Sequence, residues 1–162
     1  MAERLKILFI ASEMAPLVVT GGLADVAGAL PKALHEAGHD VRVVMPLYRS
    51  IPPEHRGKPR STCIVHMGSK TAYGALRESR VPGTQIPLYF IEHEGYFGRE
   101  APYGSGSYEY TDNPERFAFF CLATLDAIPS TGWRPPPTPG LRGWRSPRSR
   151  WRPTWGLPRA CT

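Results

Sequence analysis

Two short apolar runs enclose an amphipathic stripe near the start of the chain, and this order constrains the fold more than any other feature. Residues 5–11 form a nearly continuous apolar run, typical of a strand covered on both faces of a parallel sheet. Apolar residues then recur at helical spacing over residues 23–37, and Gly38 is placed to end that helix. The β-branched run at residues 41–45 supplies a second strand. We therefore expect a βαβ unit with a right-handed crossover, and residues 5–11 as a central strand.

The helix expected over residues 23–37 carries two specific predictions. Pro31 lies inside it, where a proline costs roughly 3 kcal/mol, so we expect a kink or a broken hydrogen-bond ladder there. The apolar stripe should face the sheet, and it consists of Leu23, Val26, Ala27, Leu30, Leu34 and Ala37.

The middle of the chain continues the α/β pattern. Residues 50–60 contain three prolines and read as a surface loop, whereas residues 63–67, 75–81 and 86–91 predict strands. Residues 95–110 combine four glycines with four tyrosines, a composition typical of loops that line sites. A helix should begin at Asp112, with a buried face made of Phe117, Phe120, Cys121, Thr124, Leu125 and Ile128. The predicted fold class is α/β, with a Rossmann-like arrangement.

The charge of the chain is concentrated at its C-terminal end. The net charge is +6, yet residues 1–126 carry 13 basic and 14 acidic side chains, whereas residues 127–162 carry seven arginines and no acid. The tail, residues 133–162, also holds all four tryptophans and seven of the 18 prolines, without a periodic apolar stripe. Such a composition does not build a packed core. We therefore divide the chain into a domain at residues 1–132 and an irregular tail at residues 133–162.

Cysteine usage and hydropathy exclude several classes of protein. Cys63, Cys121 and Cys161 lie far apart and match no zinc or disulfide spacing, so we expect no metal site and a cytoplasmic location. No apolar run approaches the ~20 residues that span a bilayer, so no membrane partner is expected. His66 and His93 fall in strand-like segments and receive no role.

The loop between the first strand and the first helix is the candidate ligand site. Residues 12–22 are long for a connection that usually takes ~2–6 residues. Gly21 and Gly22 precede a helix N-terminus, where backbone N–H groups favour an anion, and Thr20 adds a hydroxyl. The alternative is that the two glycines only satisfy a tight turn. Asp25 could stabilise the helix dipole or contact sugar hydroxyls, and Glu13 is similarly ambiguous. The G-x-G-x-x-G fingerprint of dinucleotide-binding domains is absent.

Two long runs carry a resemblance to a known family. They are ILFIASEMAPLVVTGGLADVAGALPKALHEAGHDVRVVMPLY and YGSGSYEYTDNPERFAFFCLATLD, in this order. The chain resembles the start of bacterial glycogen synthases and plant starch synthases over roughly residues 4–135. The resemblance implies an incomplete Rossmann-like N-terminal domain of a two-domain GT-B glucosyltransferase. Such an enzyme moves glucose from ADP-glucose to an α-1,4-glucan, with retention and without a metal or other cofactor. It also implies that Thr20, Gly21, Gly22 and Asp25 belong to the ADP-glucose loop.

The chain departs from the family pattern at two places. The family has a lysine, thought to contact the donor phosphates, where this sequence has Val19, so an apolar side chain replaces a charge-assisted contact. After about Pro135 the family continues into further elements of the site and a second domain, whereas this chain turns to residues with G- and C-rich codons. We therefore expect a truncated synthase whose tail is read out of frame. The rival interpretation is a basic tail that binds nucleic acid through arginine and tryptophan.

The expected function follows from the resemblance. The parent activity is glycogen or starch synthesis, and the fragment alone should be inactive, because the donor is held mainly by the second domain. A non-catalytic module that binds glucan or nucleotide through the Thr20 loop and the tyrosine-rich segment is the alternative. An open hydrophobic sheet edge should also make the chain prone to aggregation.

Overall fold

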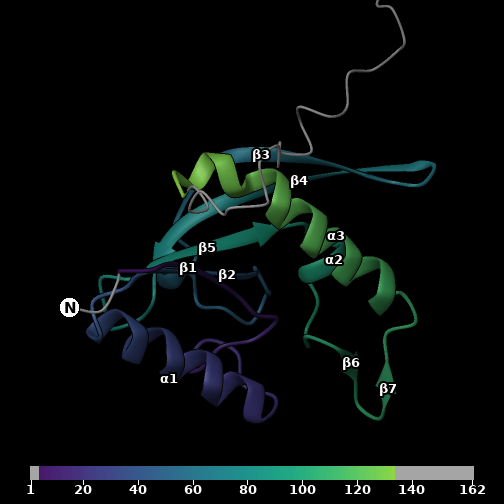
Figure 1. The fold of residues 1–162 in the computed structure, drawn as a ribbon. Coiled ribbons are helices and arrows are strands. Elements are labelled where there is room, and N and C mark those ends of the chain that lie inside the picture. The colour runs from purple at the N-terminus through teal and green to yellow at the C-terminus, as the bar shows by residue number, and fades with distance from the viewer. Residues whose placement is uncertain (1–3, 134–162) are drawn as a thin grey trace, which may run out of the picture.

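A computed structural model of the chain describes residues 4–133. Strands and helices mix along the chain, with one βαβ unit followed by a run of strands (Figure 1). In chain order they are β1 (Lys6–Ile10), α1 (Gly22–Glu36), β2 (Asp40–Pro46), the 3-10 turn η1 (Pro53–His55), β3 (Lys58–Met67), β4 (Lys70–Arg80), β5 (Pro87–Glu92), α2 (Glu94–Phe97), β6 (Gly104–Ser105), β7 (Tyr108–Glu109), α3 (Asn113–Ala127) and the 3-10 turn η2 (Ile128–Thr131).

One mixed sheet of five strands organises the domain, in the order β1-β2-β5-β4-β3. β1, β2 and β5 are parallel, with Phe9 opposite Val43 and Val43 opposite Leu88. β4 and β3 then continue the sheet as antiparallel strands. The predicted βαβ unit is confirmed. The prediction that residues 5–11 form a central strand is wrong for the described residues, in which β1 is paired on one side only.

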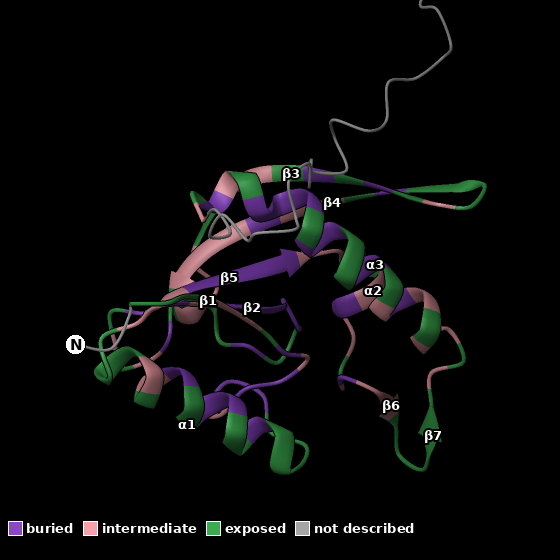
Figure 2. Cartoon of the chain, in the orientation of Figure 1, coloured by how far each residue is buried: buried purple, intermediate pink, exposed green. Residues whose placement is uncertain are grey.

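The sheet is covered by α1 on one face and by α3 on the other (Figure 1). β2 and β5 lie between these helices and are almost wholly buried, with Val43, Met45, Leu88 and Phe90 removed from solvent (Figure 2). This burial on both faces explains why their sequences read as continuous apolar runs.

The buried face of α1 differs from the one that the apolar stripe predicts. Leu23, Val26 and Leu30 are 48%, 53% and 42% exposed, and the outer face of α1 is exposed along its length (Figure 2). Of the predicted stripe, Ala27 is buried and Leu34 is partly buried against the core. The other buried positions of α1 are Ala24, Gly28 and Pro31. Small side chains let the helix backbone approach closely, and a Cβ on Gly28 would lie 2.8 Å from the carbonyl oxygen of Ala15.

Two details of α1 bear on its predicted end and on the predicted disturbance at Pro31. Gly38 has φ +93° and donates its N–H to the His35 carbonyl at 2.9 Å, so it ends α1 as expected. Pro31 neither breaks nor interrupts the helix, which runs without a gap from Gly22 to Glu36. The hydrogen-bonded turns on either side carry the helix across the one missing donor.

The buried face of α3 is only partly the predicted one. Phe120, Thr124 and Ile128 are buried, but Leu125 and Cys121 are exposed. The helix is rotated so that the fully buried positions include Phe119, Ala123 and the charged Arg116. Hydrophobicity alone does not predict this rotation, because a buried arginine carries no apolar signal.

Candidate functional site at the carboxyl edge of the sheet

Three loops meet where the parallel strands end. Residues 11–21 follow β1, residues 47–52 follow β2, and residues 93–112 follow β5 and lead into α3. Ligands of open α/β sheets bind outside the carboxyl ends of parallel strands. These loops therefore form the place where the fold itself predicts a site.

The loop after β1 is held closed by a buried carboxylate. Met14 and Val18 exchange backbone hydrogen bonds of 3.1 and 2.9 Å, so the loop folds back on itself. Glu13 is only 3% exposed, and its carboxylate accepts hydrogen bonds from the Thr20 backbone N–H, at 2.9 Å, and from the Thr20 hydroxyl. Both donors of Thr20 are thus directed at an acid inside the loop.

Gly21 and Gly22 open the helix α1, and the fold does not require glycine at either position. Neither has a positive φ, and a Cβ added at either one would meet nothing within 4 Å. The tight-turn explanation of this pair is therefore wrong. Two glycines beside open space at a helix N-terminus leave room for a group from outside the loop to approach the backbone.

A tyrosine from the loop after β5 reaches the loop after β1. The Tyr103 hydroxyl lies 2.7 Å from the Ser12 hydroxyl and also interacts with the Thr20 side chain. Burial raises the pKa of Tyr103, and the negative charge of Glu13 raises it further. Burial likewise raises the pKa of Tyr48, whose hydroxyl has no hydrogen-bond partner among the described residues. Hydroxyls and one carboxylate are therefore gathered at this edge.

The first turn of α3 places a buried cation behind this cluster. Arg116 is 0% exposed, and its Nε donates to the Tyr96 carbonyl at 2.7 Å. Its Nη1 donates to the Pro102 carbonyl and to Asn113 Oδ1, at 3.0 and 2.5 Å. Burial lowers the pKa of Arg116. The guanidinium carbon also lies 5.0, 5.5 and 5.7 Å from the ring centroids of Tyr110, Phe117 and Phe97.

The residues singled out from the sequence do not all come together. Thr20 joins the cluster with Glu13, and Gly21 and Gly22 border it at the helix start. Asp25 lies in the first turn of α1, but it lines a separate groove of about 600 Å³ with Pro16 and Lys32. Val19, at the family lysine position, is 59% exposed.

The sequence reasoning missed several residues of the cluster. Ser12, Tyr48 and the Asn113–Arg116 pair lie far apart in the sequence and match no motif of catalytic chemistry. Tyr103 was only part of a loop whose glycine and tyrosine content suggested a site. The pairing of Asn113 with Arg116 at consecutive turns of one helix is the signal that comes nearest to finding them.

His93 has a structural role in this region. Its Nδ1 accepts a hydrogen bond from the Tyr96 backbone N–H at 3.1 Å, and so caps α2. Its ring also stacks on Tyr96 with 4.1 Å between the centroids.

Within the described part of the chain, no group of three or more His, Cys, Asp or Glu side chains is placed to hold a metal ion. Across residues 4–133, no helix is long and apolar enough to cross a membrane.

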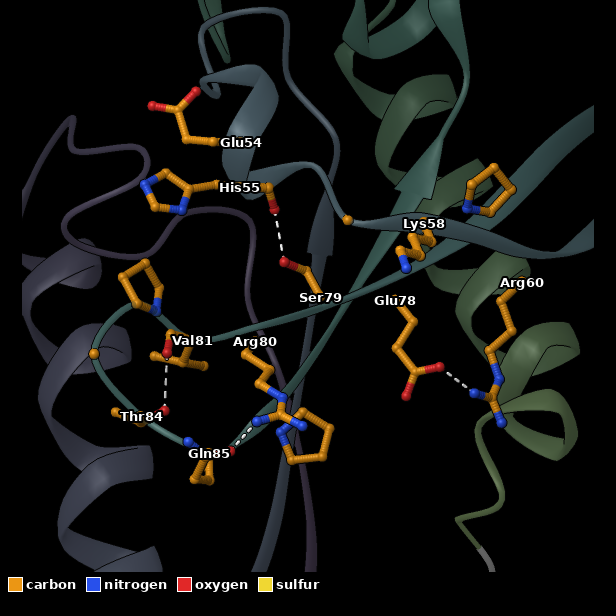
Figure 3. A pocket seen from close by; sticks show the side chains of 15 residues that line it. Glu54, His55, Lys58, Arg60, Glu78, Ser79, Arg80, Val81, Thr84 and Gln85 are labelled. Carbon is orange, nitrogen blue, oxygen red and sulfur yellow. Dashed lines mark hydrogen bonds and ion pairs between the residues drawn. The ribbon is translucent and has the colours of Figure 1, made fainter.

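A second hollow opens at the opposite end of the sheet, where β3 and β5 begin and β4 ends (Figure 3). Its volume is about 1000 Å³, and its wall is polar. Arg60 donates to Glu78, and Arg80 donates to Gln85, so both arginines have partners within the hollow (Figure 3). None of the candidate residues Thr20, Gly21, Gly22 and Asp25 lies here. We therefore place the candidate site at the carboxyl edge.

Comparison with known proteins decides the family. The model of the starch synthase catalytic domain matches residues 6–138. The chain belongs to this starch synthase family. It is 47% identical over 135 residues to glycogen synthase 1 of Geobacter sulfurreducens, and 45% identical over 133 residues to the glycogen synthase of Syntrophotalea carbinolica. These matches cover 82% and 81% of this chain, but only 27% of each relative.

A solved structure of the starch synthase family shows the same fold. The catalytic domain of starch synthase IV from Arabidopsis thaliana, bound to ADP and acarbose, matches with a TM-score of 0.63 and 29% identity. The match covers 82% of this chain and 27% of the chain in that structure. The resemblance read from the sequence and the α/β, GT-B-type fold class are therefore confirmed. The family match ends close to Pro135, where the resemblance was expected to end, and the predicted tail beyond residue 133 lies outside the described residues.

Proposed function

We propose that the carboxyl edge of this sheet is part of the active site of a glycogen synthase, which transfers glucose from ADP-glucose to an α-1,4-glucan. The observation that carries the proposal is the open space beside Gly21 and Gly22. The fold does not need glycine at these positions, so their lack of a Cβ serves a ligand. ADP-glucose and α-1,4-glucan are the proposed ligands, and Thr20, Gly21, Gly22 and Asp25 remain the proposed donor-loop residues.

The chemistry of the cluster suits a sugar. The hydroxyls of Ser12, Thr20 and Tyr103 can each donate and accept, and the Glu13 carboxylate accepts only. Sugar hydroxyls have the same dual character. A glucan could exchange hydrogen bonds with this cluster without burying an unpaired charge.

The loop is less well equipped for a diphosphate. Val19 supplies no positive charge, and the Glu13 carboxylate already accepts from both Thr20 donors. The backbone N–H groups at the start of α1 and the helix dipole remain to attract an anion. We therefore expect the chain to bind ADP weakly, and less tightly than it binds a maltooligosaccharide.

The isolated chain should not synthesise glycogen. Glucosyl transfer passes through a charged transition state that needs an enclosed site and positive groups near the leaving diphosphate. These 162 residues match about a quarter of the length of their relatives, and in the described cluster the one cation, Arg116, is buried among carbonyl groups. Purified chain supplied with ADP-glucose and glycogen should incorporate no glucose above a blank.

A valine-to-lysine substitution tests where the phosphates lie. Val19 is exposed, so Val19→Lys should leave the fold intact while it adds a cation to the loop. We expect ADP affinity, measured by calorimetry, to rise about tenfold, as one charge-assisted contact allows. Maltoheptaose affinity should not change. Val26→Lys is the matched control, because it adds the same charge at an exposed position of α1 outside the loop.

A second candidate function is a glucan-binding module without catalysis, which the loss of the loop lysine favours. It predicts that the chain binds maltoheptaose, and that Val19→Lys gains no affinity for ADP. An unchanged ADP affinity would therefore reject the donor loop, and absence of maltoheptaose binding by the native chain would reject both candidates.

A further inference from the structure

The start of α3 fixes the tyrosine loop in place, and it does so through the backbone of the loop. Arg116 contacts two separate points of the segment, because it donates to the carbonyls of Tyr96 and Pro102. Asn113 supplies a third point, since its Nδ2 donates to the Tyr103 carbonyl at 2.8 Å. The Tyr110 backbone N–H donates to the same carbonyl at 2.9 Å.

Asn113 and Arg116 act as one unit. Asn113 Oδ1 accepts from Arg116 Nη1, which orients the amide so that its Nδ2 faces Tyr103. No carboxylate among the described residues forms an ion pair with Arg116. Its Nε and Nη1 donate to oxygen atoms of carbonyl and amide groups, and its buried Nη2 has no hydrogen-bond partner among these residues. Arg116 is fully buried without an acidic partner among the described residues, and such an unpaired buried charge lowers the stability of the fold. The contacts of Arg116 therefore point to a role in holding the tyrosine loop in one conformation.

The side chain of Tyr103 transmits this geometry to the glycine loop. Its backbone is held by α3, and its hydroxyl lies 2.7 Å from Ser12 Oγ on the loop after β1. The same hydroxyl interacts with the side chain of Thr20, which donates to the Glu13 carboxylate, so the phenol borders this cluster. A small rotation of the Tyr103 backbone would move its hydroxyl out of reach.

We infer that Asn113 and Arg116 are positioning residues that hold the Tyr103 hydroxyl against the Ser12–Thr20 loop, and thereby set the shape of the glucan-binding cluster. The inference rests on the proposed function for its ligand, but the placement of Tyr103 can be measured without any ligand. Neither residue contacts the glucan, and both act through Tyr103.

Asn113→Asp separates the positioning contact from the fold. The carboxylate still accepts from Arg116, and it adds a negative charge beside that buried cation, but it no longer donates to the Tyr103 carbonyl. Gln85→Glu is the matched control, because it makes the same amide-to-acid change in the hollow at the far end of the sheet. Should Asn113→Asp fail to fold, Asn113→Ser carries the test, since its hydroxyl is too short to reach the carbonyl.

The first measurement uses the full chain without ligand. Tyrosine rings are labelled with carbon-13, and Tyr103→Phe assigns the Tyr103 signal in the NMR spectrum. We expect Asn113→Asp to shift the Tyr103 signal and to bring its pKa closer to the ordinary value, while exposed Tyr73 on β4 stays unchanged. Gln85→Glu should leave both signals in place. An unchanged Tyr103 signal in Asn113→Asp would overturn the inference.

The second measurement is a double-mutant cycle on maltoheptaose affinity by calorimetry. Asn113→Asp alone should weaken binding about fivefold, the ratio that one ordinary hydrogen bond carries. Added to Tyr103→Phe, it should weaken binding no further, because Asn113 acts through the hydroxyl already removed. Additive losses would show a merely structural role and overturn the inference. If the native chain binds no maltoheptaose, the proposed function fails, and the NMR measurement still decides the placement of Tyr103.

Discussion

At the scale of single residues, the surroundings of three glycines distinguish a packing role from a proposed ligand-binding role. Gly28 is required by the fold, because a Cβ would lie 2.8 Å from the Ala15 carbonyl oxygen. Gly21 and Gly22 are not, because a Cβ there would meet nothing within 4 Å. Gly21 and Gly22 lie at the start of α1 and Gly28 lies in its interior. Their difference lies in what surrounds them: Gly28 packs against Ala15, whereas the open space beside Gly21 and Gly22 supports the ligand role that we propose for them.

Gly22→Ala and Gly28→Ala should therefore have opposite consequences. Gly22→Ala should keep or slightly raise the free energy of unfolding, by up to about 1 kcal/mol, because alanine favours the helix and restricts the unfolded chain. Gly28→Ala should lower it by about 1–3 kcal/mol relative to Gly22→Ala, because the backbone must shift. Urea unfolding at low protein concentration measures both. Equal stabilities would show that the contact with Ala15 is not tight.

The same pair of variants tests the site. Gly22→Ala should bind maltoheptaose or ADP more weakly than the native chain, although it is at least as stable. Gly28→Ala should bind with native affinity once the measured affinity is corrected for the fraction of chains that is folded. Full ligand affinity in Gly22→Ala would contradict the assignment of the open space to a ligand.

At the scale of elements, short helices near the site depend on caps rather than on hydrophobic burial. α2 spans only Glu94–Phe97, and the backbone N–H of Tyr96 in this helix donates to His93 Nδ1. That nitrogen accepts only while the ring is neutral at Nδ1. Burial lowers the pKa of His93, which is consistent with a neutral ring in the folded chain. The cap and the stacked Tyr96 ring are thus linked to pH.

Acid should loosen this cap. Because the folded pKa of His93 lies below its unfolded value, the cap contributes fully above about pH 6.5 and is lost as pH falls through the folded pKa. Hydrogen exchange of the Tyr96 amide should therefore lose protection below about pH 6.5, beyond its intrinsic pH dependence. His93→Asn, which also caps helices but does not titrate, should abolish this loss. The prediction fails if native and His93→Asn chains show the same pH profile.

At the scale of the whole molecule, one side of the described domain is left apolar. β1 is paired only with β2, and the outer face of α1 beside it exposes Leu23, Val26 and Leu30 (Figure 2). An open strand edge next to exposed aliphatic side chains favours association between chains. The expectation of an aggregation-prone edge remains a prediction, and the structure supplies the surface that would cause it.

Charges on the outer face of α1 should suppress this association. Val26→Glu with Leu30→Lys removes two exposed apolar side chains and places an acid four residues before a base, which favours the helix. We expect light scattering at a fixed concentration to fall and the free energy of unfolding to change by less than about 0.5 kcal/mol. Tyr73→Lys, on the exposed side of β4, is the control and should leave scattering unchanged. Unchanged scattering in the variant with Val26→Glu and Leu30→Lys would show that the chains associate through another surface.

The sequence alone determined the element order, the βαβ unit and the family, because these depend on local periodicity, on Gly38 as a helix stop and on long ordered runs of residues. It also marked Thr20, Gly21 and Gly22, because a glycine pair before a helix is a local pattern. It failed where a side chain's environment comes from distant segments. The apolar stripe of α1 pointed to Leu23 and Val26, whereas close packing on Ala15 buried the small residues instead.

Only the tertiary structure decided which residues share the site. Tyr103 meets Ser12 across 91 positions of sequence, and Asn113 and Arg116 reach the tyrosine loop through carbonyl oxygens that have no side-chain signature. Backbone acceptors are the same at every residue, so a sequence cannot show which of them a buried arginine will contact. Local propensity determined the elements, and the packing of three loops at one sheet edge decided the chemistry between them.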